Sequence, residues 1–405
     1  MEPNSRLKLE AISVTLAILL VSVPIHNDVE YALQSEARSA DTLGGNSFID
    51  APTWRVNDRW VYSGELDVYD FIADSGVSTN VNTLTGTLDV QVESINLVDV
   101  GGVQTLAYTV AGTGDYRADN IQLEGQNGDV VVEMDTTSVI RVSDMAVISQ
   151  TATIDIEFDP AFGWICWLIS CDIASITASN EYWPPLERHD FPLSVGDTWV
   201  NNYTLNTTYS GSSSYVTIPQ STSDQVETTS TVVQAGYPGV SQSGCSVSYN
   251  VTATDVNGSL VGYGWHCDSM KNDVITLNEV TLGLMARHEI DYSTLSPRPY
   301  VIDVEPMYPL APFDFTSPIW VNVSDANGAP TANQLIEFRY DPTGEVQTIT
   351  TESNGSAFTT LNYGSQGDES LVDGEHGSHG IVARIVNTDH MGISTITLDL
   401  SLIHI

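Results

Sequence analysis

The sequence predicts an all-β protein made of tandem antiparallel modules, each a β-sandwich or a curved sheet. Three observations support this prediction. Apolar and polar residues alternate in many short segments, as in strands with one buried face. Beyond residue 50 no apolar stripe with helical spacing lasts three turns, although 139–149 comes closest. A short motif also occurs twice, which indicates a repeated module.

The alternation is clearest in five segments. In one of them Ile336, Phe338 and Tyr340 alternate with the charged residues Glu337 and Arg339. Because successive side chains of a strand point to opposite faces, such a segment buries its apolar face and exposes the other. The five segments are 88–92, 106–110, 154–158, 336–340 and 396–400.

The repeated motif is a tight turn that leads into a strand with a tryptophan. Residues 54–61 match residues 193–200, and two later aromatic residues keep approximately the same spacing. A turn of this kind positions the tryptophan to fill a core. We therefore predict two related modules, over 51–185 and 186–297. The aligned residues are Asp58 with Asp197, Trp60 with Trp199, Tyr108 with Tyr249, and Phe158 with Tyr292.

The composition is strongly acidic. The 405 residues include 13 Lys and Arg against 52 Asp and Glu, a formal net charge of −39. This charge repels phosphate backbones, which argues against nucleic acid as a partner. The hydrophobic residues amount to 41% of the chain, enough for a large core. The composition is that of a folded, acidic protein, suited to a salty medium that screens its charges.

Residues 1–50 are predicted to be a signal peptide and a flexible leader. Arg6 and Lys8 precede an apolar run over 11–23, which Pro24 ends. The run is shorter than a membrane span and matches the core of a secretory signal, with an uncleaved anchor as the alternative. We therefore expect an extracellular or cell-surface location.

Four cysteines, Cys166, Cys171, Cys245 and Cys267, fit two disulfides in an exported chain. Four cysteines allow three pairings, and proximity favours Cys166–Cys171 and Cys245–Cys267. Folding the chain about Val256 places Cys245 opposite Cys267 in a hairpin, which favours the second pair.

Residues 296–299, Ser-Pro-Arg-Pro, are predicted to be a linker to a last domain over 298–405. This domain contains a strand followed by Asp325-Ala-Asn-Gly-Ala-Pro330, and later Thr351-Glu-Ser-Asn-Gly-Ser-Ala357. With these turns it resembles a bacterial immunoglobulin-like domain of the invasin/intimin type. The resemblance implies a β-sandwich with a spacer or adhesion role and no catalytic residues.

The whole chain also resembles the multi-domain secreted surface proteins of archaea, in its acidity, its scarcity of lysine and its tandem modules. The last six residues, 400–405, look like translated sequencing-adapter read-through, so we expect the natural chain to continue. Membrane association is then expected only through an N-terminal anchor or a missing C-terminal one. Other surface proteins or glycans are the expected partners.

Calcium is the one cofactor that the sequence suggests. Asp325, Asn327, Asp373 and Glu375 offer the hard oxygen ligands that calcium prefers. An Asp-x-Asn-Gly sequence is also typical of a hairpin turn, which is the alternative for Asp325 and Asn327. The pair His376 and His379 follows in the same polar segment, where a solvated loop is expected rather than a metal site.

Glycosylation is a further possibility for an exported chain, because Asn-x-Ser/Thr sequons are acceptor sites. The count of sequons is close to chance for this composition, so it does not by itself indicate modification. The candidates are Asn202, Asn206, Asn250, Asn257, Asn322 and Asn354.

No catalytic motif stands out. The chain has no GxSxG, HExxH, P-loop or GxGxxG sequence. His189 beside Asp190 is interpreted as a structural pair, and His266 adjoins Cys267, whose predicted disulfide removes the thiol. We therefore expect a non-enzymatic surface protein with a structural, spacer or adhesion role. The alternatives are a lipid- or glycan-binding module and a secreted hydrolase.

Overall fold

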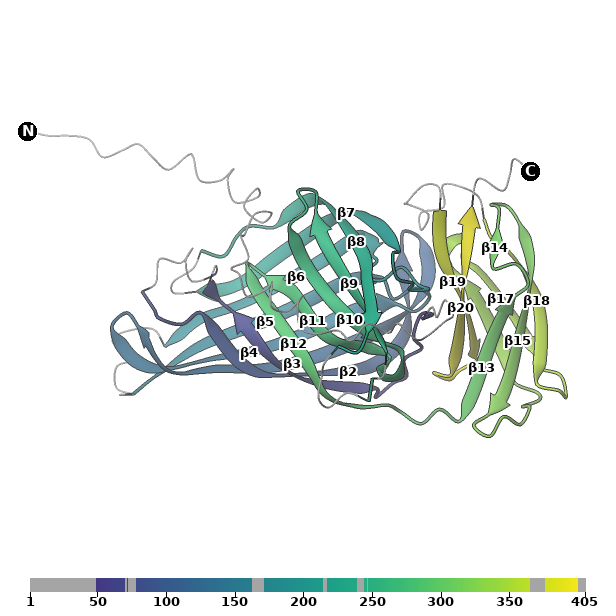
Figure 1. Cartoon of the computed structure of the whole chain (residues 1–405), viewed down its shortest axis with the longest axis horizontal. Coiled ribbons are helices and arrows are strands. Elements are labelled where there is room, and N and C mark those ends of the chain that lie inside the picture. The colour runs from purple at the N-terminus through teal and green to yellow at the C-terminus, as the bar shows by residue number, and fades with distance from the viewer. Residues whose placement is uncertain are drawn as a thin grey trace, which may run out of the picture.

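The computed structural model describes residues 49–69, 71, 78–161, 171–213, 217–238, 244–245, 247–364 and 376–399. Over these residues the chain first forms a closed barrel and then two further sheets, which lie against one end of it (Figure 1). The all-β prediction is confirmed. Residues 1–48 of the signal segment and leader, and residues 400–405, lie outside the described residues, so the predictions for them remain predictions. The end of the predicted flexible leader is corrected, because Ile49 forms a β-bridge with Leu193 and Asp50 accepts a hydrogen bond from Thr395.

The barrel is built from β1 to β12, which follow one another around the ring in chain order. A short 3₁₀ helix, η3 (Asp268–Met270), connects β10 to β11. The strands are β1 (Arg59–Asp67), β2 (Thr83–Val100), β3 (Val103–Leu123), β4 (Gln126–Arg141), β5 (Val147–Pro160), β6 (Asp172–Leu186), β7 (Thr198–Ser213), β8 (Thr222–Gly236), β9 (Ser248–Asp255), β10 (Leu260–Cys267), β11 (Asn272–Thr281) and β12 (Leu284–Thr294).

The closed ring corrects the prediction of separate sandwiches. Strand β12 pairs with β1, and β6 pairs with β7, so both predicted modules belong to one sheet. The physical reason is edge pairing: each six-stranded half alone would leave two unpaired edges, and closure removes all four. The two modules are curved sheets that share the buried cluster around Trp60, while Trp199 and Tyr249 of the second module lie in a smaller cluster of their own.

The repeat is visible in the backbone of the two predicted turns. The amide of Val92 donates to the carbonyl of Asp58 at 2.9 Å, and the amide of Val232 donates to the carbonyl of Asp197 at 2.9 Å. Asn57 and Gly196 occupy the same place in the two turns, and both have positive φ, at 71° and 98°. Conformations of this kind favour Asn and Gly over most residues. Residues 54–61 and 193–200 therefore form the same local structure.

The later markers of the repeat agree only in part. Tyr108 and Tyr249 lie in β3 and β9, the third strands of their halves. Phe158 lies in β5, a fifth strand, whereas Tyr292 lies in β12, a sixth strand, so this last alignment is wrong. Because the strands of the two halves differ in length, residues at the same distance from the two tryptophans do not occupy equivalent strands of the barrel.

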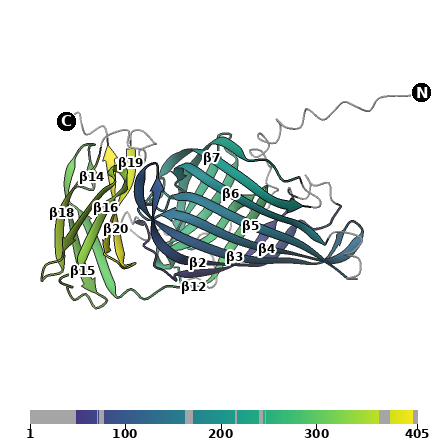
Figure 2. The same cartoon turned by 180° about the vertical axis from the view of Figure 1, so that it is seen from behind.

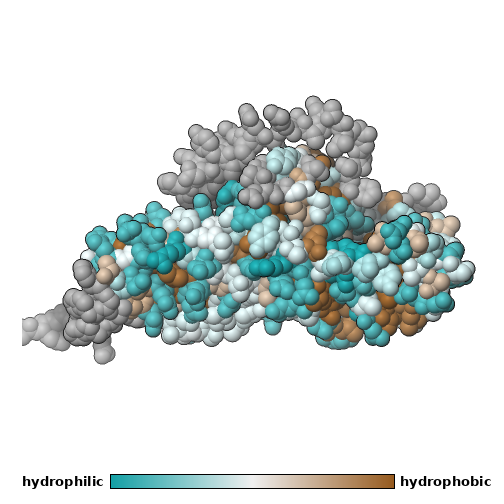
Figure 3. Space-filling model, turned by 90° about the horizontal axis from the view of Figure 1, so that it is seen from below, coloured by the Kyte–Doolittle hydropathy of each residue, from teal (hydrophilic) through white to brown (hydrophobic). Residues whose placement is uncertain are grey.

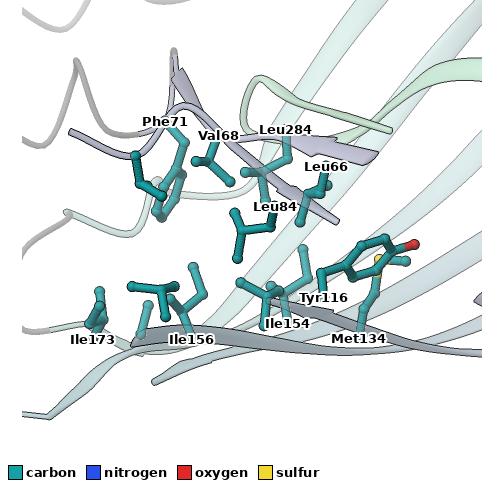
Figure 4. Close-up of a cluster of buried hydrophobic side chains, with 14 of the residues drawn as sticks. Leu66, Val68, Phe71, Leu84, Tyr116, Met134, Ile154, Ile156, Ile173 and Leu284 are labelled. Atoms are coloured by element: carbon teal, nitrogen blue, oxygen red, sulfur yellow. The ribbon is translucent and has the colours of Figure 1, made fainter. Parts of the chain in front are cut away.

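The interior of the barrel is packed with apolar side chains from opposite walls. In Figure 4 the side chains of Leu66, Leu84 and Leu284 point toward those of Ile154 and Ile156. The three leucines come from the neighbouring strands β12, β1 and β2, and the two isoleucines from β5, yet all five belong to one buried cluster. A second cluster centres on Trp60 and Tyr108 of the predicted motifs. Burial of these large side chains is the main driving force for closing the ring.

The residues after the barrel form two sheets, one of three strands and one of five, packed face to face. The first has the order β13-β15-β18 and the second β14-β20-β19-β16-β17. A second 3₁₀ helix, η4 (Asp341–Thr343), follows β16. The strands are β13 (Tyr300–Pro306), β14 (Leu310–Ala311), β15 (Thr316–Asp325), β16 (Leu335–Tyr340), β17 (Glu345–Thr350), β18 (Ser356–Asn362), β19 (His376–Ile385) and β20 (Met391–Asp399).

The five alternating segments lie in strands, as predicted. Ile336, Phe338 and Tyr340 are fully buried in the core between the two sheets. The segments 88–92, 106–110 and 154–158 lie in β2, β3 and β5, and 396–399 lies in β20. Residues 139–149, the stretch closest to a helical pattern, form instead the end of β4, the turn over 142–146 and the start of β5.

The sandwich lies directly against the barrel, as both views of the chain show (Figures 1 and 2). Val382 of β19 and Met391 of β20 belong to the same buried cluster as Trp60 of the barrel. The hydroxyl groups of Thr105 and Ser143 donate to the buried carboxylate of Asp341, with Ser143 at 2.8 Å. Ser296 and Arg298 of the predicted linker both donate to Asp58, so the linker is part of a packed joint between the two bodies.

The molecular surface is mainly hydrophilic over the barrel on the face shown in Figure 3, and apolar residues gather toward the sandwich. This agrees with the outward-facing polar positions of the barrel strands. No helix within the described ranges is long and apolar enough to cross a membrane.

Candidate functional site

Two histidines and one aspartate converge near the end of the β10–β11 hairpin. His266 in β10 and Asp273 in β11 are direct cross-strand partners, so their side chains share a face of the sheet. His189 reaches them from the connection between β6 and β7. In the part of the chain that the structure describes, this is the one group of three such side chains whose ligand atoms lie within 4.8 Å of one another.

Both imidazoles face the same oxygen of Asp273. His266 Nδ1 lies 3.1 Å from Oδ1 and His189 Nε2 lies 3.3 Å from it. The His266 side chain is almost fully buried, whereas those of His189 and Asp273 keep 13% and 17% of their surface exposed. The cluster is therefore buried on the side of His266 and in contact with solvent on the side of His189 and Asp273.

Electrostatics favour a charged carboxylate and an uncharged His266. Burial raises the pKa of Asp273, but the charge of His189 and hydrogen bonds from both imidazoles outweigh burial and hold this pKa well below its usual range. Burial lowers the pKa of His266, and the hydrogen bond to Asp273 opposes that shift only in part. His266 Nε2 is buried and lacks a hydrogen-bond partner among the described residues.

Neighbouring side chains hold the cluster in place. The ring of Phe191 stacks on His189, with centroids 5.6 Å apart, and meets His266 edge-on at 5.2 Å. Gly264 leaves room for the carboxylate, because a Cβ at this position would lie 2.4 Å from Asp273 Oδ2. The hydroxyl of Tyr62 donates to the backbone carbonyl of Asp273 at 3.0 Å. These contacts fix the orientation of all three groups.

A disulfide next to the cluster also restrains it. Cys245 and Cys267 are bonded, with Cα atoms 6.1 Å apart, so this predicted pairing is confirmed. The hairpin argument for it is wrong in register, since Tyr249 is the partner of His266 and Cys245 precedes β9. Cys166 lies outside the described residues, and the Cys166–Cys171 pairing remains a prediction.

The structure assigns Asp325 and Asn327 to a turn. Asp325 Oδ1 accepts the amides of Asn327 at 2.8 Å and of Ala329 at 2.9 Å, and these bonds hold the pKa of Asp325 below its usual range. This is the hairpin-turn alternative weighed for the Asp-x-Asn-Gly sequence. Asp373 and Glu375 lie outside the described residues, so calcium binding there remains a prediction.

His376 and His379, which follow Asp373 and Glu375 in the sequence, do not lie in a solvated loop. His376 begins β19, and the imidazole of His379 is buried where the sandwich meets the barrel. Burial lowers the pKa of His379 to about 4. The expectation of a loop is therefore wrong, because β-pairing with β20 begins already at His376.

The glycosylation candidates differ in exposure. Asn250 is 3% exposed and lies in β9, so a glycan cannot be accommodated there in the folded protein. Asn206 is half-buried, and its side chain accepts a hydrogen bond from Ser223 at 2.7 Å. The remaining candidates are exposed: Asn202, Asn257, Asn322 and Asn354.

The sequence contains the three cluster residues, but reasoning from it missed the cluster. Local reasoning links His189 with its neighbour Asp190 and His266 with Cys267. No sequence pattern singles out Asp273. One signal was available: a hairpin turning over 268–271 would place 266 and 273 side by side. No local pattern indicates His189, which only closure of the barrel brings close.

No protein-family model matches the chain, and no curated protein is similar to it in sequence.

Proposed function

We propose that this chain is a secreted or cell-surface, non-enzymatic protein in which barrel and sandwich act as one rigid spacer. The observation that carries this proposal is the joint between the two bodies. Asp58, at the first repeat turn, is fully buried and accepts bonds from Ser296 N at 2.7 Å and Arg298 Nη2 at 2.8 Å. Both donors belong to the segment that leads into the sandwich.

A second set of contacts supports a rigid joint. Arg55 donates to Asp389, with Nη2 2.7 Å from Oδ1, and these side chains are 16% and 22% exposed. Asp389 lies between β19 and β20, so the pair ties the first repeat turn to the connection between the last two strands of the sandwich. Partly buried ion pairs resist rearrangement, because separating them leaves a poorly hydrated charge.

The strand order of the sandwich supports the immunoglobulin-like resemblance. Its first sheet contains the first, third and sixth strands of the domain, and its second sheet has the order second, eighth, seventh, fourth and fifth. Strand β14 pairs in parallel with β20, while the other neighbours are antiparallel. This arrangement fits an immunoglobulin-type sandwich, and we propose that the domain is one.

Small-angle X-ray scattering tests the spacer proposal. The double variant Arg55→Ala/Arg298→Ala removes the arginines that bind Asp389 and Asp58 at the joint, and Arg117→Ala/Arg287→Ala removes two arginines from the exposed barrel surface as a matched control. We expect wild type and control to fit one rigid particle, and the joint variant to need several orientations. Wild-type scattering that itself requires several orientations would contradict the proposal.

Export needs its own test. Residues 1–50 fused to a reporter enzyme should direct the reporter out of the cell, because their charged and apolar segments match a secretory signal. A fusion that begins at residue 51 is the control. Retention of both fusions inside the cell would contradict the proposed location.

Glycan binding is a second candidate function, favoured by an exposed aromatic pair on the sandwich. Trp320 and Phe358 lie opposite each other in β15 and β18, with ring centroids 4.6 Å apart, and are 44% and 40% exposed. Glu305 is the partner of Trp320 on the other side, and Asp303 lies on the same face. Aromatic rings flanked by hydrogen-bond acceptors suit the apolar faces and hydroxyl groups of neutral sugars.

A binding screen with neutral oligosaccharides tests this candidate. Trp320→Ala should abolish any binding found, whereas Tyr292→Ala, which removes an exposed aromatic of the barrel, should not. The same samples, incubated with peptide, ester and glycoside substrates, address the secreted hydrolase, for which we expect no turnover. Release of product by wild type would contradict the non-enzymatic proposal.

A further inference from the structure

We propose that His189, His266 and Asp273 bind one divalent transition-metal ion, and that Zn²⁺ is the ion they fit best. Such a metal site is independent of the spacer role. Its three potential ligands converge from three segments of the chain: the β6–β7 connection, β10 and β11.

The distances suit a small ion. Ligands bound tetrahedrally to Zn²⁺ at about 2.0–2.1 Å lie about 3.3 Å from one another. Asp273 Oδ1 already lies 3.1 Å from His266 Nδ1 and 3.3 Å from His189 Nε2, and every pair of donor atoms lies within 4.8 Å. The two imidazoles therefore need to approach each other by at most about 1.5 Å, which small ring rotations supply.

The site is also preorganised. Phe191 contacts both imidazoles, and the absence of a side chain at Gly264 makes space for Asp273 Oδ2. The disulfide at Cys267 fixes the residue next to His266. A ligand set that is held before the ion arrives loses little entropy on binding, and outer contacts of this kind orient metal ligands.

The donor set selects the class of metal. Two imidazoles and one carboxylate suit Zn²⁺ and related ions, and three protein ligands leave a fourth position for water. Calcium prefers six to eight oxygen ligands, which this cluster does not offer. The partial exposure of His189 and Asp273 gives an ion access to the site from solvent.

Hydrogen bonding to Asp273 leaves His266 with a single polar partner and with Nε2 buried and unpaired. An unpaired buried nitrogen destabilises the fold. A metal ion at Nδ1 would leave Nε2 unpaired as well, but the metal–nitrogen bond is strong enough to offset this cost. An ion would also join the inter-repeat connection to the β10–β11 hairpin.

Titration of the chelator-treated full chain tests the proposal. Zn²⁺ binding is measured by calorimetry, and Co²⁺ serves as a second probe because its visible absorption reports a tetrahedral site. We expect one ion per chain and no displacement by Ca²⁺. His189→Gln, in the β6–β7 connection, should weaken binding at least about tenfold, since it removes one ligand. His390→Gln, which alters a histidine of the sandwich, should leave binding unchanged.

Three results would overturn the proposal. One is the absence of Zn²⁺ binding to wild type, which would leave Asp273 as a hydrogen-bond acceptor only. Another is unchanged affinity in His189→Gln, which would place the ion elsewhere. The third is equal affinity for Ca²⁺, which would show that imidazole is not part of the ligand set.

Discussion

Asp58 and Arg298 form a salt bridge of 2.8 Å in which the carboxylate is fully buried. Asp197, the residue that takes the place of Asp58 in the second half of the barrel, is partly exposed and caps its own turn through the amide of Ser194 at 2.8 Å. The two copies of the motif therefore differ in role. Asp197 only stabilises its own turn, whereas Asp58 also binds the segment that leads into the sandwich.

This difference predicts unequal effects of one substitution. Asp58→Ala leaves Arg298 and two backbone amides without their partner, so the free energy of unfolding should fall by about 3–5 kcal/mol. Asp197→Ala removes a turn contact and should cost about 1 kcal/mol. Urea denaturation measures both values. Equal losses would show that the linker contacts add nothing to stability.

A buried histidine predicts loss of stability in acid. His288 lies inside the barrel, where Nε2 is 2.5 Å from the hydroxyl of Tyr116, and burial lowers its pKa to about 4. The unfolded chain takes up this proton near pH 6.5 and the folded chain only near pH 4, so stability is complete above pH 6.5 and falls as the pH drops toward 4. A shift of this size corresponds to about 3 kcal/mol.

The variant His288→Phe tests this assignment, because phenylalanine fills similar space without titrating. Its unfolding free energy should depend less on pH between 6.5 and 4 than that of wild type. His379, whose pKa burial also lowers to about 4, contributes a similar dependence that remains in the variant. An unchanged pH profile in His288→Phe would refute the role given to His288.

The disulfide between Cys245 and Cys267 should stabilise the barrel by restricting the unfolded chain. The two residues are 22 positions apart, and a loop of this length corresponds to about 3 kcal/mol in the chain-entropy model. The double variant Cys245→Ser/Cys267→Ser should lose this amount in urea denaturation. A reducing agent should destabilise wild type more than the variant, and equal sensitivity would count against this contribution.

The turn at Asp325 distinguishes a structural carboxylate from a calcium ligand. Asparagine keeps the oxygen that accepts the amides of Asn327 and Ala329, so Asp325→Asn should change the melting temperature little, whereas Asp325→Ala should lower it. Melting curves with and without Ca²⁺ complete the test. A calcium-induced rise that Asp325→Asn abolishes would establish the residue as a ligand.

Most of the strand pattern could be predicted from local sequence. Alternation of apolar and polar residues predicted the buried faces in β2, β3, β5, β16 and β20, since the period of a strand shows in a few consecutive residues. The repeated turns could also be predicted from the sequence, because the positive φ at Asn57 and Gly196 restricts which residues fit there. Closure into one ring could not be predicted, because the pairing of β1 with β12 joins segments at opposite ends of the barrel sequence.

The candidate site shows the same division. His266 and Asp273 lie in one hairpin, within reach of local reasoning, but His189 comes from a connection far earlier in the chain. By itself the sequence determined the strands and turns, which depend on nearby residues, the acidity, which depends on composition alone, and one correct cysteine pair. Only the tertiary structure decided that the two halves share a core, that Asp58 binds Arg298 and that three ligands meet. These contacts arise from ring closure, and spacing along the chain does not encode them.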